Sequence, residues 1–152
     1  MSTLRLLAAV LTQARQRYTA LLGAQDSFEV AYASSPAEIQ AHLARPDTRT
    51  DVLIVDQALG GVFDLVRGLR QAYPRLLIIL VDEEADISIP GHADDVSTDP
   101  FTNDDLIRRI RRLVQERQTE TLRADALPSI RTVAKQLRQA SGLMGKADAA
   151  VK

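Results

Sequence analysis

The chain has 152 residues, of which 45% are hydrophobic and 26% are charged, and its formal net charge is −1. These values suit one domain with a hydrophobic core plus an appendage, and the absence of cysteine excludes disulfides and thiolate metal sites. The charge is uneven: residues 1–103 carry 8 Lys/Arg against 14 Asp/Glu, a net of −6, and residues 104–152 carry 11 against 6, a net of +5.

The first third of the chain alternates between strand and helix patterns. Residues 4–11 form an apolar run typical of a strand covered on both faces. The run is too short to span a bilayer, so we expect a cytoplasmic protein with no membrane segment. A helical stripe follows over about 12–23, with Gly23 as its stop, and residues 28–32 read as a second strand. Ser35-Pro36-Ala37-Glu38 predicts a capping box that starts a second helix.

The middle of the chain continues this alternation. Residues 51–56 form a third strand that ends in Asp56, and Gly60-Gly61 make a turn after it. The next helix, which we expect to end before Pro74, is marked by three apolar residues: Phe63, Val66 and Leu69.

The last part of the sheet is less regular. Residues 76–81 are the most apolar strand and belong near the sheet centre. Residues 82–91 hold four acids, Pro90 and Gly91 but little helical periodicity, so we expect a loop or at most one turn there. Val96 and Ser97 centre a fifth strand. A second capping box over residues 102–105 precedes a helix whose inward residues are Leu106, Ile110, Leu113 and Val114.

This order predicts an α/β fold with a doubly wound, five-stranded parallel sheet. The flavodoxin-like strand order 2-1-3-4-5 is the natural choice, with a shortened fourth helix. The pattern changes after about Gln115. We therefore assign residues 1–115 to the domain and residues 116–152 to a helical C-terminal extension with a frayed tail. That extension carries one apolar stripe, formed by Ile130, Val133 and Leu137.

Two strand ends carry a resemblance to a known family. Asp56 at the end of the third strand and Pro100-Phe101 after the fifth resemble the response-regulator receiver (CheY-like) domain, over roughly residues 4–115. In that family the strand-end aspartate accepts a phosphoryl group, carboxylates after the first strand hold Mg²⁺, and a lysine precedes Pro-Phe. The resemblance implies a bacterial two-component signalling domain with Asp56 at the phosphoacceptor position.

The chain departs from that family pattern at the residues that support phosphorylation. No carboxylate occurs before Asp26, Asp82 stands where the family places Thr or Ser, and Asp99 replaces the lysine. Three carboxylates would repel an incoming phosphoryl group. We therefore expect a degenerate pseudo-receiver that is not an enzyme and acts as a protein–protein interaction module in bacterial signalling or localisation. The alternatives are an atypical receiver phosphorylated on Asp56 and a nucleic-acid-associated adaptor that uses the basic C-terminal half.

The same three carboxylates raise the question of a metal. Asp56, Asp82 and Asp99 would end three adjacent strands, and oxygen-rich clusters of this kind suit Mg²⁺ or Ca²⁺. Capping of nearby backbone amides is the favoured reading of these side chains. The expected cofactor is therefore none, with Mg²⁺ or Ca²⁺ as the alternative.

Two further groups of residues are candidates for partner binding. Arg108, Arg111 and Arg112 share one helix face, which could meet phosphates or an acidic partner. Because no aromatic residue follows Phe101 to stack on bases, the sequence favours a protein partner over nucleic acid. The stripe of Ile130, Val133 and Leu137 suggests a homodimer formed through the C-terminal helices.

Overall fold

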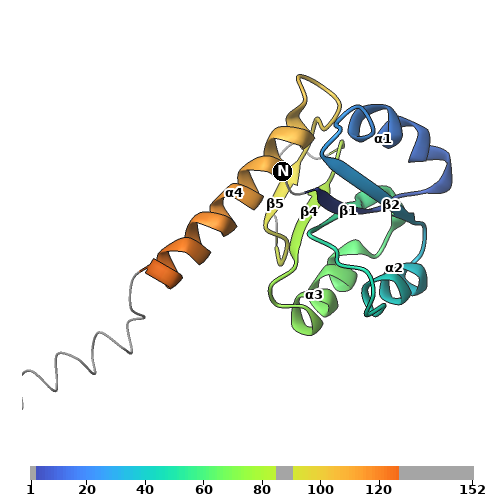
Figure 1. The fold of residues 1–152 in the computed structure, drawn as a ribbon. Helices are drawn as coiled ribbons and strands as arrows, with labels where there is room; N and C mark the ends of the chain where they lie inside the picture. Colours follow the sequence, from blue (N-terminus) through green and yellow to red (C-terminus); the bar gives the residue numbers. More distant parts are fainter. Residues whose placement is uncertain (1–2, 85–90, 127–152) are drawn as a thin grey trace, which may run out of the picture. The chain divides into compact units, whose positions relative to one another are not determined.

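The computed structural model describes residues 3–84 and 91–126, and its first unit is a parallel β-sheet flanked by helices (Figure 1). The strand order is β2-β1-β3-β4-β5, as the sequence predicts. In chain order the elements are β1 (Leu4–Ala9), η1 (Thr12–Ala14), α1 (Arg15–Leu22), β2 (Phe28–Ala33), α2 (Pro36–Leu43), β3 (Val52–Asp56), η2 (Gln57–Leu59), α3 (Val62–Ala72), β4 (Leu77–Val81), β5 (Asp95–Ser97) and α4 (Asp105–Ala126).

The hydrophobic core has two parts, one on each face of the sheet. Side chains alternate along a strand, so Leu6 and Ala8 of β1 face one part and Leu7 and Ala9 face the other. Helices α1 and α4 cover the first face and α2 and α3 cover the second (Figure 1). Every residue of β3 and β4 is buried, because these central strands are covered on both sides.

Several local signals in the sequence act as predicted. The Ser35 hydroxyl accepts a hydrogen bond from the Glu38 amide at 3.2 Å, and Pro36 is the first residue of α2. Helix α1 ends before Gly23, where a Cβ atom would lie 2.6 Å from the Thr19 carbonyl oxygen. Only glycine therefore allows the backbone to close this helix end so tightly.

The second capping box, predicted over residues 102–105, does not form. Helix α4 begins only at Asp105, after Asn103 and Asp104 adopt left-handed φ values of 53° and 55°. The Thr102 hydroxyl donates to Oδ1 of Asp99 at 2.7 Å, so the Asp105 amide bonds the Thr102 backbone carbonyl at 3.1 Å instead. The prediction was wrong because the Asp99 carboxylate competes for the threonine hydroxyl.

Helix α3 confirms the helix predicted from Phe63, Val66 and Leu69, and it ends before Pro74. Its buried face consists of Val62, Val66 and Leu69, whereas the Phe63 side chain is 53% exposed. The helix begins directly at Val62, after two glycines with positive φ, and this start turns Val62 inward in place of Phe63.

The connection from β4 to β5 is described only in part. Residues 82–84 and 91–94 form turns and bends, while residues 85–90, on which the predicted helix shortening also depends, lie outside the described residues. The chain divides into two units, Met1–Val114 and Gln115–Lys152. The predicted stripe of Ile130, Val133 and Leu137 lies outside the described residues. Within residues 3–84 and 91–126, no helix is both long and apolar enough to cross a membrane.

Candidate functional site

The candidate site is built around Asp56, the last residue of β3 and the one charged residue that is buried within the described part of the chain. Its Oδ2 accepts a hydrogen bond from the Tyr18 hydroxyl at 2.7 Å, and its Oδ1 accepts one from the Ala58 amide at 2.9 Å. The second contact caps η2, the 3-10 turn that follows the strand. Both carboxylate oxygens therefore have partners within the domain, as a buried carboxylate requires.

Tyr18 comes from α1 and is fully buried. Burial, followed by the hydrogen bond to the Asp56 carboxylate, raises the pKa of the Tyr18 hydroxyl far above its ordinary value. The hydroxyl is therefore a stable neutral donor. Its ring packs edge-on against Phe101, with centroids 5.1 Å apart and planes at 68°.

Arg17, the neighbour of Tyr18 on α1, brings a positive charge to this edge of the sheet. Its guanidinium lies 4.2 Å from the centroid of the Phe101 ring and 2.8 Å from the Glu83 carboxylate. The hydrogen bond with Glu83 raises the pKa of Arg17 against the opposing effect of burial, and Asp56 adds to the increase. The ion pair is exposed, so its contribution to stability is small.

Asp82 and Asp99 make local contacts in their own loops. Oδ1 of Asp82 accepts from the Glu84 amide at 3.3 Å, and Oδ1 of Asp99 accepts from the Thr102 hydroxyl at 2.7 Å. Among the described residues, no group of three or more His, Cys, Asp or Glu could hold a metal ion. The described structure therefore does not bring Asp56, Asp82 and Asp99 together as one group, and Asp82 and Asp99 each accept a hydrogen bond within their own turn.

The end of β1 offers no carboxylate to complete the Asp56 site. Val10, which follows this strand, is fully buried, and its amide bonds the Ala33 carbonyl at 3.0 Å. The first acidic residue of the chain, Asp26, comes just before β2 and so lies at the opposite edge of the parallel sheet.

A second polar cluster joins β5 to the start of α4. The buried Ser97 hydroxyl donates to Oδ2 of Asp105 at 2.7 Å, and Nε of Arg109 donates to the same oxygen at 2.8 Å. Burial by itself would raise the pKa of the Asp105 carboxyl, but the hydrogen bonds from Arg109 and Ser97 outweigh it and lower this pKa below its ordinary value. Arg109 and Arg112 both pair with Asp95, at 2.9 Å and 2.6 Å.

The arginines of α4 do not form the single strip that the sequence suggested. Arg111 packs over the Phe28 ring at 4.9 Å and donates to Gln25 at 2.7 Å, whereas Arg112 reaches Asp95 of β5. Arg108 lies 3.9 Å from Asp105. The three side chains therefore diverge toward different partners within the domain, which reduces the free positive charge that they offer to phosphates.

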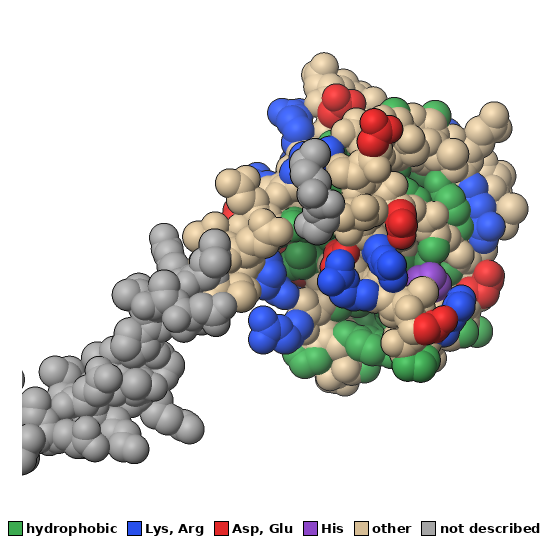
Figure 2. All heavy atoms as spheres, in the orientation of Figure 1, with side chains coloured by type: hydrophobic (Ala, Val, Ile, Leu, Met, Phe, Trp, Pro, Cys, Tyr) green, Lys and Arg blue, Asp and Glu red, His purple; other side chains and the backbone are tan. Residues whose placement is uncertain are grey.

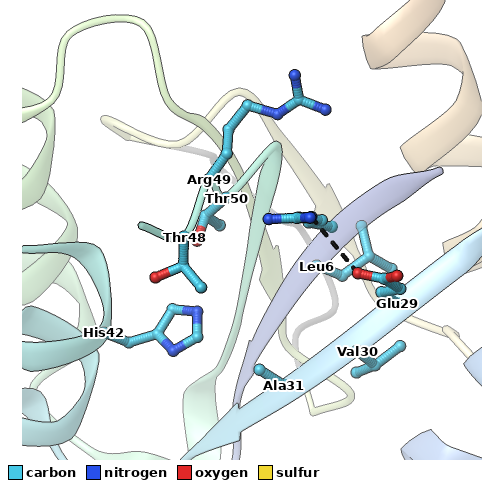
Figure 3. A pocket seen from close by; sticks show the side chains of 9 residues that line it. Leu6, Glu29, Val30, Ala31, His42, Thr48, Arg49 and Thr50 are labelled. Atoms are coloured by element: carbon cyan, nitrogen blue, oxygen red, sulfur yellow. Dashed lines mark ion pairs between the residues drawn. The ribbon is translucent and has the colours of Figure 1, made fainter. Parts of the chain in front are cut away.

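A hollow of about 180 Å³ lies at the opposite edge of the sheet, where β1, β2 and β3 begin (Figure 3). His42 lies beside Thr48 at its wall, and the dashed ion pair joins Arg5 to Glu29 at 3.4 Å (Figure 3). Arg49 on the rim pairs with Asp51 at 3.1 Å. Because its arginines are paired and it is separated from Asp56 by the length of the strands, this hollow is not part of the candidate site.

Side chains of α2 and α3 line a groove on the surface, and Gln40 and Asp64 are among them. Figure 2 shows hydrophobic side chains along the lower edge of the view, over these two helices. The residues that line the groove include Ala44, Leu65, Gly68, Leu69 and Tyr73. A Cβ atom added at Gly68 would meet nothing within 4 Å, so the floor of the groove is open at that point.

Solved structures similar to this domain include receiver domains. A response regulator from Thermotoga maritima shares 22% identity over 74% of this chain and 98% of its own, with a TM-score of 0.63. A CheY-like receiver domain protein from Methanospirillum hungatei shares 19% identity over 79% and 99%, with a TM-score of 0.64. No protein-family model and no curated protein sequence matches the chain.

A third similar structure carries a metal. It is the receiver domain of a sensor histidine kinase from Pseudomonas aeruginosa, with magnesium in its active-site cleft, at 19% identity over 73% of this chain and 97% of that domain, TM-score 0.60. At these identities the likeness shows the fold. The chain has the CheY-like receiver fold, and Asp56 ends its third strand within it.

The sequence identified Asp56 but missed its two neighbours on α1. Tyr18 lies within the helical stripe predicted over about 12–23, and no pattern in the sequence marks Arg17. A buried tyrosine requires a hydrogen-bond partner for its hydroxyl, and that requirement was the available signal. Which partner it would meet depends on how α1 packs against the end of β3.

Proposed function

We propose that this chain is a receiver-like protein–protein interaction module of bacterial signalling that acts without phosphorylation of Asp56 and without enzymatic activity. The observation that carries the proposal is that both oxygens of Asp56 are already hydrogen-bonded, by Tyr18 and by the Ala58 amide. A phosphoryl acceptor must present an accessible oxygen to the donor, whereas the Asp56 side chain is buried and held by these two donors. Divalent-metal chemistry also needs further oxygen ligands beside the acceptor.

Two further features support the proposal that Asp56 is not phosphorylated. The end of β1 lacks acidic residues, and Asp99 stands where the resemblance implies a lysine. The first change removes the oxygen ligands that would hold a divalent cation, and the second places a negative charge in the position of a positive one, where a dianionic phosphoryl group would have to approach. Without phosphorylation, contact with other proteins is the use of this fold that we propose.

The direct test is phosphorylation by a small phosphodonor with Mg²⁺. We expect no stoichiometric labelling of the full chain, and no change in its proton–nitrogen NMR spectrum on addition of Mg²⁺ and beryllofluoride. The Tyr18→Phe variant should be tested for labelling in parallel, because it frees one oxygen of Asp56 from its hydrogen bond while keeping the aromatic ring. Stoichiometric labelling of the wild-type chain at Asp56 would overturn the proposal.

The second candidate function is an atypical receiver phosphorylated on Asp56. The observation in its favour is Arg17, whose guanidinium supplies a positive charge at this edge from α1. Under this alternative, labelling would occur and would fall in an Arg17→Gln variant. The same experiment therefore separates the two functions.

The partner and the assembly follow from the same proposal. We expect a protein partner, and we propose residues 116–152 as an extension that forms a homodimer through Ile130, Val133 and Leu137. Arg108, Arg111 and Arg112 remain candidate contacts for a partner, although their present contacts with the domain count against the nucleic-acid alternative. A truncation after Gln115 that leaves the oligomeric state unchanged would remove the dimer proposal.

A further inference from the structure

Tyr18 touches two segments that are distant in the sequence. Its hydroxyl bonds Asp56 at the end of β3, and its ring packs on Phe101 in the turn between β5 and α4. The tyrosine is fully buried and has few rotatable bonds, so neither contact can move far without disturbing the other.

Two adjacent residues of α1, Arg17 and Tyr18, contact the Phe101 ring. Tyr18 meets this ring edge-on, and the Arg17 guanidinium lies 4.2 Å from the ring centroid. Arg17 is held in turn by Glu83, which follows β4. The position of the Phe101 ring therefore depends on α1 and on the ends of two strands.

The turn that carries Phe101 is conformationally demanding. Asn103 and Asp104 have φ values of 53° and 55°, in the left-handed region that residues other than glycine rarely adopt and that Asn and Asp tolerate best. Such residues persist when surrounding contacts hold them in place. The turn leads directly to Asp105, the first residue of α4 and the acceptor for Ser97 and Arg109.

We propose that Tyr18 is a latch that couples the state of the Asp56 carboxylate to the conformation of the turn at residues 99–104. While Asp56 accepts the tyrosine hydroxyl, Tyr18 holds Phe101 and the turn in the observed position. A change that removes this acceptor releases the tyrosine, and the turn and the start of α4 respond. The coupling goes beyond the proposed interaction function and does not require it.

The test is a mutant cycle on the full chain, read out by urea unfolding. Asp56→Ala and Phe101→Leu are combined in the wild-type background and again in the Tyr18→Phe background. We expect the two changes to be coupled by about two- to tenfold in the unfolding equilibrium constant in the first background. The coupling should fall to about onefold in the second, because the connecting hydroxyl is gone.

The matched control is Asp51→Ala combined with Phe101→Leu. Oδ2 of Asp51 accepts from the Arg5 amide at 2.8 Å, so Asp51 also bonds a donor in another element, but at the opposite edge of the sheet. This pair should be additive. A coupling between Asp56 and Phe101 that is onefold in both backgrounds, or equal in both, would overturn the latch.

Amide NMR shifts give a second readout that needs only the conservative Tyr18→Phe variant to fold. We expect shifts at Asp56–Ala58 and also at Thr102–Leu106. Shifts confined to α1 and to the end of β3 would contradict the proposal. Because the experiment uses neither phosphodonor nor partner, failure would remove the latch and leave the proposed interaction function standing.

Discussion

The Arg70 guanidinium on α3 lies 2.7 Å from the carboxylate of Asp94, the residue just before β5. The same guanidinium donates to the backbone carbonyls of Pro74, Leu76 and His92, at 3.1, 2.7 and 3.1 Å. Asp94 in turn accepts from the Ile78 amide of β4 at 2.8 Å. One side chain thus fixes the end of α3, the start of β4 and the entry to β5.

We expect Arg70→Ala to lower the free energy of unfolding by about 1–3 kcal/mol, because it leaves several acceptors and a half-buried carboxylate without their donor. Urea unfolding measures this loss. Arg67→Ala is the matched control on the same helix. The ion pair of Arg67 with Asp64 is exposed, so its loss should change stability by about 0.5 kcal/mol or less. Equal losses for the two variants would contradict the role assigned to Arg70.

Because of Tyr18, the free energy of unfolding should depend on pH in the alkaline range. Its folded-state pKa is raised, so its contribution is fully present below the unfolded pKa of about 10 and is lost as pH rises above that value. We expect Tyr18→Phe to lower stability by about 1–3 kcal/mol at neutral pH. Above about pH 10 the difference from wild type should shrink.

The comparison for Tyr18 is Tyr32→Phe, which removes a hydroxyl bonded to Thr19 at the surface. We expect this variant to change stability by about 0.5 kcal/mol or less. Denaturant unfolding of the three proteins between neutral pH and pH 11 checks the prediction. A constant difference between wild type and Tyr18→Phe across this range would refute the titration argument.

Asp105 should control stability at acid pH. The folded-state pKa of this carboxyl is lowered, so its contribution is present above the unfolded pKa of about 4 and is lost as pH falls through the lower folded value. We expect Asp105→Asn to cost about 1–3 kcal/mol near pH 7, because it weakens the acceptor for the buried Ser97 hydroxyl. In thermal unfolding between pH 2 and pH 7, the melting temperature of the variant should fall less with decreasing pH than that of the wild type.

Asp104→Asn is the matched control for Asp105. It changes a neighbouring, exposed carboxylate, and asparagine tolerates the left-handed φ of 55° at that position. The melting temperature of this variant should fall with decreasing pH as it does in the wild type. If both variants reduce this pH dependence equally, the effect belongs to net charge and not to the contacts of Asp105.

The exposed Phe63 gives a simple test of the buried face of α3. We expect Phe63→Ser to change stability by about 0.5 kcal/mol or less, since half of the side chain is already exposed. Val66→Ala removes buried methyl groups on the same helix and should cost about 1–3 kcal/mol. Urea unfolding ranks the two, and a larger loss for the phenylalanine would place it in the core.

The sequence by itself determined the sheet and most of its helices. Apolar runs such as residues 76–81, the Ser35 cap and the Gly60-Gly61 turn act over a few residues, so their effects can be read from the chain alone. The strand-end position of Asp56 followed from the same patterns.

Only the tertiary structure decided what Asp56 contacts. The bond from Tyr18 crosses 38 residues of sequence, and its formation depends on how α1 packs on the sheet. The same holds for the start of α4, where the Asp99 carboxylate accepts the Thr102 hydroxyl hydrogen bond and the predicted capping box therefore does not form. Patterns within one segment predict that segment, whereas a side chain's partner depends on packing between segments.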